Sequence, residues 1–146
     1  MNIKIQATGS QIKGGDMDNE NDEHKYPMRQ ETFKIIGICM EIHRILGKGF
    51  LEIVYKDACE YEFKQKDIIY AREVEYGVNY KDVILPHRFF ADFVVFDDII
   101  LEIKAQKELP QEFDHQVLNY LTVSKCKIGL LVNFGLDSLK FRRLII

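Results

Sequence analysis

An almost unbroken apolar segment, residues 128–134, lies near the end of the chain. Apolar residues at every position, rather than at every second one, indicate a β-strand that is covered on both faces. A further apolar strand is predicted at residues 99–104, and an amphipathic helix over residues 110–124 separates the two strands. Because a strand, a helix and a strand in this order form a parallel crossover, the segment favours an α/β fold.

The remaining elements follow from the spacing of apolar residues, which is three to four in helices and two in strands. Gly47-Lys48-Gly49 separates two predicted helices, and Pro86 interrupts a predicted strand because proline cannot donate to a β-ladder. We expect helices at residues 29–46 and 51–65, and strands at residues 73–80, 83–85, 89–96 and 139–146. The predicted order is α-α-β-β-β-α-β-β.

The chain has 146 residues, which suits one domain. Residues 1–27 are dominated by small and polar side chains, so we predict a disordered tail followed by a single domain over residues 28–146. A translation start at Met17 is a further hypothesis for this tail. The net charge of −3 excludes a protein that coats nucleic acid by bulk positive charge, but it does not exclude a local acidic metal site.

The three cysteines are far apart and form no CxxC pair. We therefore expect reduced, buried thiols and a cytoplasmic protein. No apolar run approaches the roughly 18 residues that a membrane-spanning helix needs, and the N-terminus is polar. The sequence thus predicts neither a membrane span nor a signal peptide.

Asp92 and Glu102 stand out because each interrupts an apolar strand, where an unpaired charge is costly. By alternation, Glu102 and Lys104 lie on one face of their strand. Asp92 faces Glu102 only if the connection has an odd number of residues, for example 96–98, or if the ladder contains a bulge. We therefore predict an odd loop or a bulge, which brings the two side chains to roughly 5 Å apart at Cβ.

Two carboxylates this close repel each other unless a cation intervenes. Their oxygens suit Mg²⁺ or Mn²⁺, and Lys104 can polarise a water molecule or stabilise the negative charge of a reacting phosphate. Metal-assisted hydrolysis of a phosphodiester requires this set of groups. The simpler alternative is a salt-bridge cluster on the surface of a hairpin.

The residues around this cluster resemble a known family. Asp92, followed after nine residues by Glu102-Ile103-Lys104, resembles the signature of PD-(D/E)XK nucleases. The segment Gly-Phe-Leu-Glu-Ile-Val-Tyr at residues 49–55 is similar to the motif that names the GxxExxY family, a group of small PD-(D/E)XK-like proteins. Residues 116–121 resemble the QxxxY element of the following helix, and the similarity extends over about residues 36–146.

This resemblance implies a restriction-endonuclease-like core, α-β-β-β-α-β, with a mixed central sheet flanked by helices. The fold would carry an extra N-terminal helix region and a C-terminal antiparallel strand. The implied activity is hydrolysis of phosphodiester bonds in DNA or RNA, with Mg²⁺ or Mn²⁺ as cofactor.

The resemblance also implies a role for each residue of the cluster. Asp92 and Glu102 would bind the metal, together with the backbone carbonyl of Ile103, and Lys104 would assist the attacking water. Glu52 would complete the acidic cluster, directly or through a water molecule.

Four residues are expected to position the substrate: Gln116, Tyr120, Tyr55 and Arg88. Gln116 and Tyr120 are four residues apart and therefore share one helix face. Arg88 is included as the nearest basic residue, because Phe90 stands where relatives often carry arginine. Packing is the simpler alternative for Tyr55, Gln116 and Tyr120.

Three functional hypotheses remain open at this point. The first is a Mg²⁺-dependent nuclease. The second is a non-catalytic module that uses the nuclease fold to bind nucleic acid or protein. The third is a homodimer built on the last strand, residues 139–146, which combines apolar and charged side chains.

Overall fold

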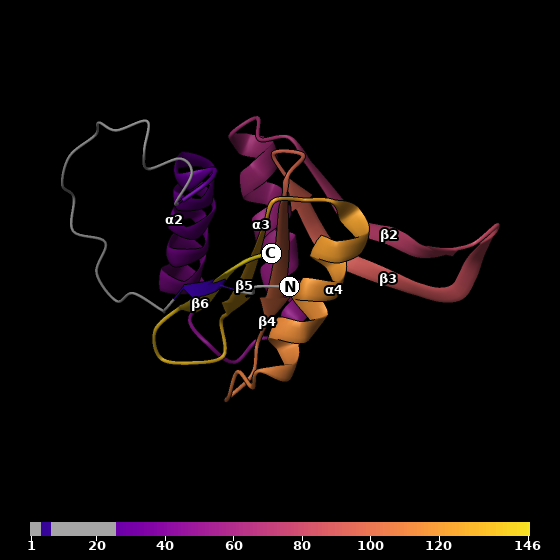
Figure 1. Cartoon of the computed structure of the whole chain (residues 1–146). Coiled ribbons are helices and arrows are strands. Elements are labelled where there is room, and N and C mark those ends of the chain that lie inside the picture. Colours follow the sequence, from indigo (N-terminus) through magenta and orange to yellow (C-terminus); the bar gives the residue numbers. More distant parts are fainter. Residues whose placement is uncertain (1–3, 7–25) are drawn as a thin grey trace.

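The computed structural model describes residues 4–6 and 26–146 of the chain. In this part of the chain, six strands form one sheet, and helices cover both of its faces (Figure 1). The strands are β1 (Lys4–Gln6), β2 (Tyr70–Tyr80), β3 (Val83–Val95), β4 (Ile99–Lys104), β5 (Ile128–Asn133) and β6 (Lys140–Ile145). The helices are α2 (Arg29–Leu46), α3 (Glu52–Gln65) and α4 (Glu112–Ser124).

The sheet is mixed, with the strand order β1-β6-β5-β4-β3-β2. β4 and β5 are parallel and are connected through α4, whereas every other neighbouring pair is antiparallel. Every residue of β5 is buried, as its continuous apolar run predicts. The restriction-endonuclease-like α/β fold, with an additional helix before it and an antiparallel strand after it, is confirmed.

Two apolar layers hold the helices on the sheet. α2 and α3 pack on one face, where their buried residues meet alternate side chains of β3, β4 and β5. α4 packs on the other face, against the side chains between them, such as Ile100 and Leu131. Because successive side chains of a strand point to opposite faces, β4 and β5 supply both layers at once.

β3 is longer than the sequence predicts, because it continues through Pro86 instead of being interrupted there. β3 pairs with β4 only from Phe93 onward, so its preceding residues pair with β2 alone. The pairing with β2 is irregular between Gly77–Arg88 and Asn79–Ile84, and Pro86 lies in this bulge, where the ladder does not need its missing N–H. Figure 1 shows this part of the β2–β3 hairpin extending beyond the body of the domain.

The last strand differs from the sequence expectation in its neighbours. β6 is not the edge of the sheet, because β1 pairs with it antiparallel over residues 4–6. β1 covers only residues 143–145 of β6, and the homodimer on residues 139–146 stays a prediction. Most of the predicted disordered tail, residues 1–27, lies outside the described residues, and the three that form β1 are a strand. Apolar and polar residues alternate over residues 2–6, a short signal that the polar composition of the whole tail obscured.

Two expectations concern the environment of the protein. All three cysteines are buried and free. Among the described residues, no helix combines the length and the apolar character that crossing a bilayer requires.

Candidate active site

The loop between β3 and β4 sets the geometry of the acidic pair. Phe93 pairs with Leu101, and Val95 pairs with Ile99, so the loop consists of residues 96–98. This is the odd, three-residue loop that the sequence predicts, and its first two residues have positive φ angles. The same register continued by one step places Asp92 opposite Glu102, just beyond the last paired residues.

The two carboxylates are held by reciprocal hydrogen bonds to the backbone. Glu102 Oε1 accepts a hydrogen bond from the Asp92 N–H at 3.0 Å, and Asp92 Oδ2 accepts one from the Ile103 N–H at 2.8 Å. Asp92 is 6% exposed and Glu102 is 3% exposed. One oxygen of each carboxylate is thereby fixed, and Asp92 Oδ1 and Glu102 Oε2 remain for other partners.

Burial and mutual repulsion destabilise the state in which both carboxylates of the pair are ionised. Burial, and then the charge of Asp92, raise the pKa of Glu102 to about 8, against the opposing effects of the Asp92 N–H and of Lys104. At neutral pH, one of the two negative charges must therefore be compensated, either by a bound proton or by a nearby cation such as a divalent metal ion.

Lys104 supplies one of the nearby positive charges. Its Nζ lies 3.8 Å from Glu102 Oε2, which confirms that the two residues share a face of β4. The Lys104 ammonium also donates a hydrogen bond to Gln116 Oε1 at 3.2 Å and lies 4.5 Å from the centroid of the Phe113 ring. These contacts from α4 fix the ammonium beside the acidic pair.

Lys56 supplies a second positive charge, which the sequence analysis missed. Its Nζ lies 2.6 Å from Asp92 Oδ1, 3.3 Å from Glu73 Oε1 and 3.8 Å from Glu52 Oε1. Burial lowers the pKa of Lys56, but its hydrogen bond to Asp92 and the charges of Asp92 and Glu73 outweigh that effect and raise it. The spacing of Lys56 from Glu52, one helical turn on α3, is the signal that could have identified it.

Glu73 is the second residue that the sequence analysis missed. Its φ of 53° lies in the left-handed region, which is uncommon for a non-glycine residue inside a strand. Arg72 and Val74 pair with Phe93 and Ala91, whereas Glu73, which would face Asp92, has no partner in this ladder. The interrupted pairing leaves the Asp92 N–H for the carboxylate of Glu102.

Glu52 is the first residue of α3 and lies at the margin of the site. Burial raises its pKa; Lys104 opposes this effect, and the charge of Asp92 adds to it. Lys56 contacts both Glu52 and Asp92, so Glu52 joins the cluster through that ammonium. In the part of the chain that the structure describes, no three His, Cys, Asp or Glu side chains are placed to hold a metal together.

The remaining donor set fits a hard divalent cation. Asp92 Oδ1 and Glu102 Oε2 are not bonded to the backbone, and they come from directly opposed residues. The N–H and C=O of one strand residue point toward the same neighbouring strand. Because the Ile103 N–H points toward Asp92, the Ile103 carbonyl faces the same side. Three oxygen donors of this kind are the ligands that Mg²⁺ and Mn²⁺ prefer.

Gln116 and Tyr120 lie on the face of α4 that borders the cluster. Gln116 binds Lys104, and Tyr120 is almost fully buried, with its ring against Phe89. Burial, and then the charges of Glu102 and Asp92, raise the pKa of Tyr120 above its usual range. The predicted sharing of one helix face is confirmed, and the face borders the two carboxylates.

Tyr55 does not occupy the position predicted for it. The residue has no exposed surface, so it cannot contact a substrate. Its hydroxyl donates a hydrogen bond to the Gly47 carbonyl at 2.7 Å and accepts one from the Phe50 N–H at 3.3 Å. Its ring stacks on Phe134. Tyr55 therefore fixes the loop that leads into α3, and the alternative of a packing role is the correct one.

Arg88 lies on the projecting part of the hairpin, outside the cluster. Its Nε is 3.3 Å from Glu75 Oε1, and its Nη1 donates a hydrogen bond to the Leu85 carbonyl at 2.6 Å. Ala91 packs in the α4 layer and Phe93 in the layer of α2 and α3, so the strict alternation of β3 is broken at Asp92. The partners given for Arg88 all belong to the hairpin, and none of them is a carboxylate of the cluster.

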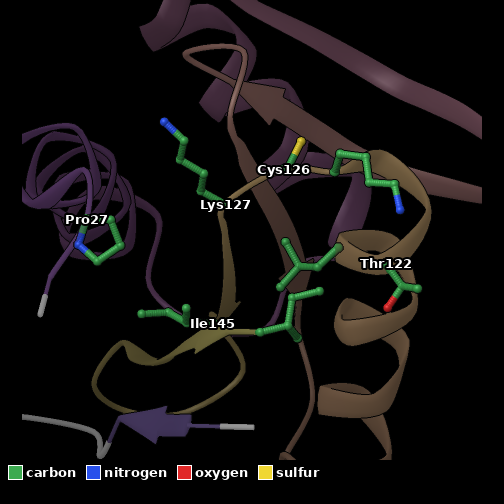
Figure 2. Close-up of a pocket in the computed structure, with 8 residues that line it drawn as sticks. Pro27, Thr122, Cys126, Lys127 and Ile145 are labelled. Atoms are coloured by element: carbon green, nitrogen blue, oxygen red, sulfur yellow. The ribbon is translucent and has the colours of Figure 1, made fainter. Parts of the chain in front are cut away.

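A separate cavity of about 550 Å³ lies between the end of α4 and the end of β6 (Figure 2). Most of its lining is apolar, and none of the residues of the acidic cluster borders it. Pro27, Thr122, Cys126, Lys127 and Ile145 are among the lining residues. The cavity is therefore distinct from the acidic site.

The chain is similar to proteins of one known family. Residues 29–144 match the PD-(D/E)XK nuclease superfamily. No curated protein matches the chain. The crystal structure of SSO0001 is similar, with a TM-score of 0.52 and 22% identity over 64% of this chain and 50% of that chain. This chain thus spans about half the length of that protein, and the similarity shows the fold alone. The family match covers most of the chain and contains the whole acidic cluster, so the chain belongs to the PD-(D/E)XK nuclease superfamily.

Proposed function

We propose that the protein is a Mg²⁺- or Mn²⁺-dependent nuclease that hydrolyses phosphodiester bonds of DNA or RNA. The observation that carries this proposal is the pair of opposed, buried carboxylates, Asp92 and Glu102, beside an ammonium fixed by a second element. A buried arrangement of this kind is costly for folding alone, since the two acids repel each other.

The metal ligands would be Asp92, Glu102 and the carbonyl of Ile103, with Glu52 acting from the margin, through water. When bound, the cation supplies a Lewis acid for the phosphate and neutralises the charge of the carboxylates. The backbone hydrogen bonds to both carboxylates fix their orientation before any ligand arrives. Preorganisation of this kind lowers the cost of reorganisation during the reaction.

Lys104 is the residue that we propose to act on the reacting groups. Its ammonium lies beside Glu102 and is oriented by Gln116, so it can hold the attacking water or stabilise the negative charge that develops on the phosphate. Tyr120 and Gln116 would limit the space around the phosphate. Arg88 would contact the nucleic acid at a distance from the bond that is cleaved.

A non-catalytic, nucleic-acid- or protein-binding module is the second candidate function. One observation favours it: Lys56 already neutralises Asp92, and no described group of three acidic, histidine or cysteine side chains is placed to hold a metal. Such a module would retain the fold and the acidic cluster without hydrolysis.

Cleavage assays distinguish the two functions. Purified protein is incubated with single- and double-stranded DNA and RNA, with Mg²⁺, with Mn²⁺ or with a chelator. We expect metal-dependent cleavage, reduced on the order of 100-fold or more in Asp92→Asn and in Lys104→Met. Lys127→Met, at an exposed lysine outside the cluster, is the matched control and should cleave normally. Cleavage that persists in both cluster variants would contradict the proposal, and binding without cleavage would support the module.

Two finer assignments belong to the same proposal. Gly49, Glu52 and Tyr55 support membership of the GxxExxY group within the superfamily. The three free, buried cysteines support a cytoplasmic location.

A further inference from the structure

Only one carboxylate oxygen of Asp92, Oδ1, is not bonded to the backbone, and Lys56 already contacts it. Oδ2 accepts the hydrogen bond of the Ile103 N–H, whereas Oδ1 lies 2.6 Å from the Nζ of Lys56. The Lys56 side chain is 13% exposed and that of Asp92 is 8% exposed, so water screens this ion pair poorly. A divalent cation at Asp92 would therefore meet a nearby positive charge.

Lys56 already donates a hydrogen bond to a second carboxylate, that of Glu73. Its Nζ lies 3.3 Å from Glu73 Oε1, and the side chain of Glu73 is half exposed, unlike that of Asp92. The left-handed backbone at Glu73 removes this residue from the β2–β3 ladder at the position facing Asp92. Backbone strain of this kind persists only where the surrounding structure maintains it, and it is concentrated at functional sites.

We propose that Lys56 is the resident counter-cation of the acidic pair and that binding of a divalent cation transfers its ammonium from a position shared by Asp92 and Glu73 to Glu73 alone. The inference rests on the metal site of the proposed function. In the metal-free protein, Lys56 compensates the buried charge of Asp92. In the metal-bound protein, Glu73 holds the displaced ammonium, so the cation and Lys56 do not compete for the same oxygen.

Calorimetric titration of the chelator-treated, full-length protein with Mn²⁺ tests this transfer. Lys56→Met removes the competing charge, so we expect Mn²⁺ affinity to rise about 10-fold, which corresponds to roughly 1.4 kcal/mol. Glu73→Gln removes the alternative partner and should lower the affinity. Lys64→Met, at an exposed lysine on the same helix, is the matched control and should leave the affinity unchanged.

The double variant separates transfer from simple electrostatics. If Glu73 acts through Lys56, Glu73→Gln has no effect on Mn²⁺ affinity in the Lys56→Met background. A loss of affinity that persists in that background would overturn the transfer, because Glu73 would then act on the cation directly. An unchanged or lower affinity in Lys56→Met would overturn the role of Lys56 while leaving the metal site intact. Absence of Mn²⁺ binding in both the wild type and Lys56→Met would overturn the inference and the metal-dependent function together.

Discussion

The reciprocal bonding of Asp92 and Glu102 explains how two acids persist inside an apolar sheet. Each carboxylate accepts the N–H of a residue on the opposite strand, so each also satisfies a buried backbone donor. Removal of either side chain leaves that donor without a partner, which costs about 1–3 kcal/mol. The pair is therefore part of the fold as well as part of the proposed chemistry.

The raised pKa of Glu102 predicts a pH dependence of stability for the metal-free protein. The Glu102 carboxyl group keeps its proton up to about pH 8 in the folded state but loses it near pH 4.5 in the unfolded state. Protonation at low pH therefore favours folding. The contribution is complete below the unfolded pKa and is lost as the pH rises to about 8, at no more than about 1.4 kcal/mol per pH unit.

Urea unfolding of chelator-treated wild type and Glu102→Gln between pH 5 and pH 8 measures this contribution. We expect the wild type to lose stability relative to the variant as the pH rises. A difference that stays constant over this range would mean that Glu102 is already ionised at pH 5.

At the level of residues, the sequence predicted the acids better than their partners. Asp92, Glu102 and Lys104 were identifiable because charged side chains within apolar strands are unusual. Lys56 and Glu73 are polar residues in otherwise ordinary segments, and only the tertiary structure brings them to Asp92. A motif that contains Tyr55 does not indicate whether its hydroxyl points to a substrate or to a loop.

At the level of elements, α4 approaches β5 closely enough to require a glycine. A Cβ on Gly129 would lie 2.3 Å from Val117 Cγ1 and 3.4 Å from Leu121 Cδ1, both on α4. This close contact sets the distance between the helix and the sheet. The distance between Gln116 on α4 and Lys104 on β4 depends on the same contact.

Gly129→Ala should consequently affect both stability and the site. We expect a loss of about 1–3 kcal/mol in the free energy of unfolding, because the added methyl group forces α4 outward. Chemical denaturation measures that loss. Gly37→Ala is the matched control, since a Cβ there has no neighbour within 4 Å. Equal stability of Gly129→Ala and wild type would show that α4 adjusts without cost.

The loop before α3 depends on the Tyr55 hydroxyl, which Tyr55→Phe removes. The substitution leaves the Phe50 N–H and the Gly47 carbonyl without this partner, so we expect the free energy of unfolding to fall by about 1–3 kcal/mol. Denaturant unfolding tests the loss, and substrate affinity, measured on the folded variant, should change little. A large loss of affinity at unchanged stability would restore Tyr55 to the substrate site.

The order of elements was predictable from periodicity, whereas their ends were not. The continuous apolar run of β5 and the alternation of β2 are visible in the sequence because burial selects apolar side chains. The passage of β3 through Pro86 was not, because it depends on a bulge in the pairing with β2. β1 was missed because its alternation of apolar and polar residues is short and lies within a polar tail.

At the level of the whole molecule, the β2–β3 hairpin extends the domain beside the site (Figure 1). One face of its projecting part packs toward α4 through Tyr76 and Phe89. The opposite face carries Phe90, which is 51% exposed and two residues from Asp92. We predict that a nucleic acid bound at the acidic pair reaches this ring, since exposed aromatic rings stack on unpaired bases.

The chain contains no tryptophan, so Phe90→Trp introduces a single fluorescent reporter at this position. We expect single-stranded oligonucleotides to quench its emission in the presence of Ca²⁺, used here as a binding probe. Phe33→Trp, at an exposed position on α2, is the control and should not respond. Quenching that is equal at both positions, or absent at Phe90 while binding is detected otherwise, would contradict a path along the hairpin.

The three-residue connection between β3 and β4 also limits how homologous chains can vary in length. One residue inserted or deleted there would turn Glu102 toward the apolar layer that α2 and α3 cover. Two residues would restore the facing pair. Length changes between the two acids should therefore occur in steps of two, unless a bulge compensates for them. A sequence search that accepts only even length changes between the two acids would separate chains in which the acids face each other from chains that merely contain the motif residues.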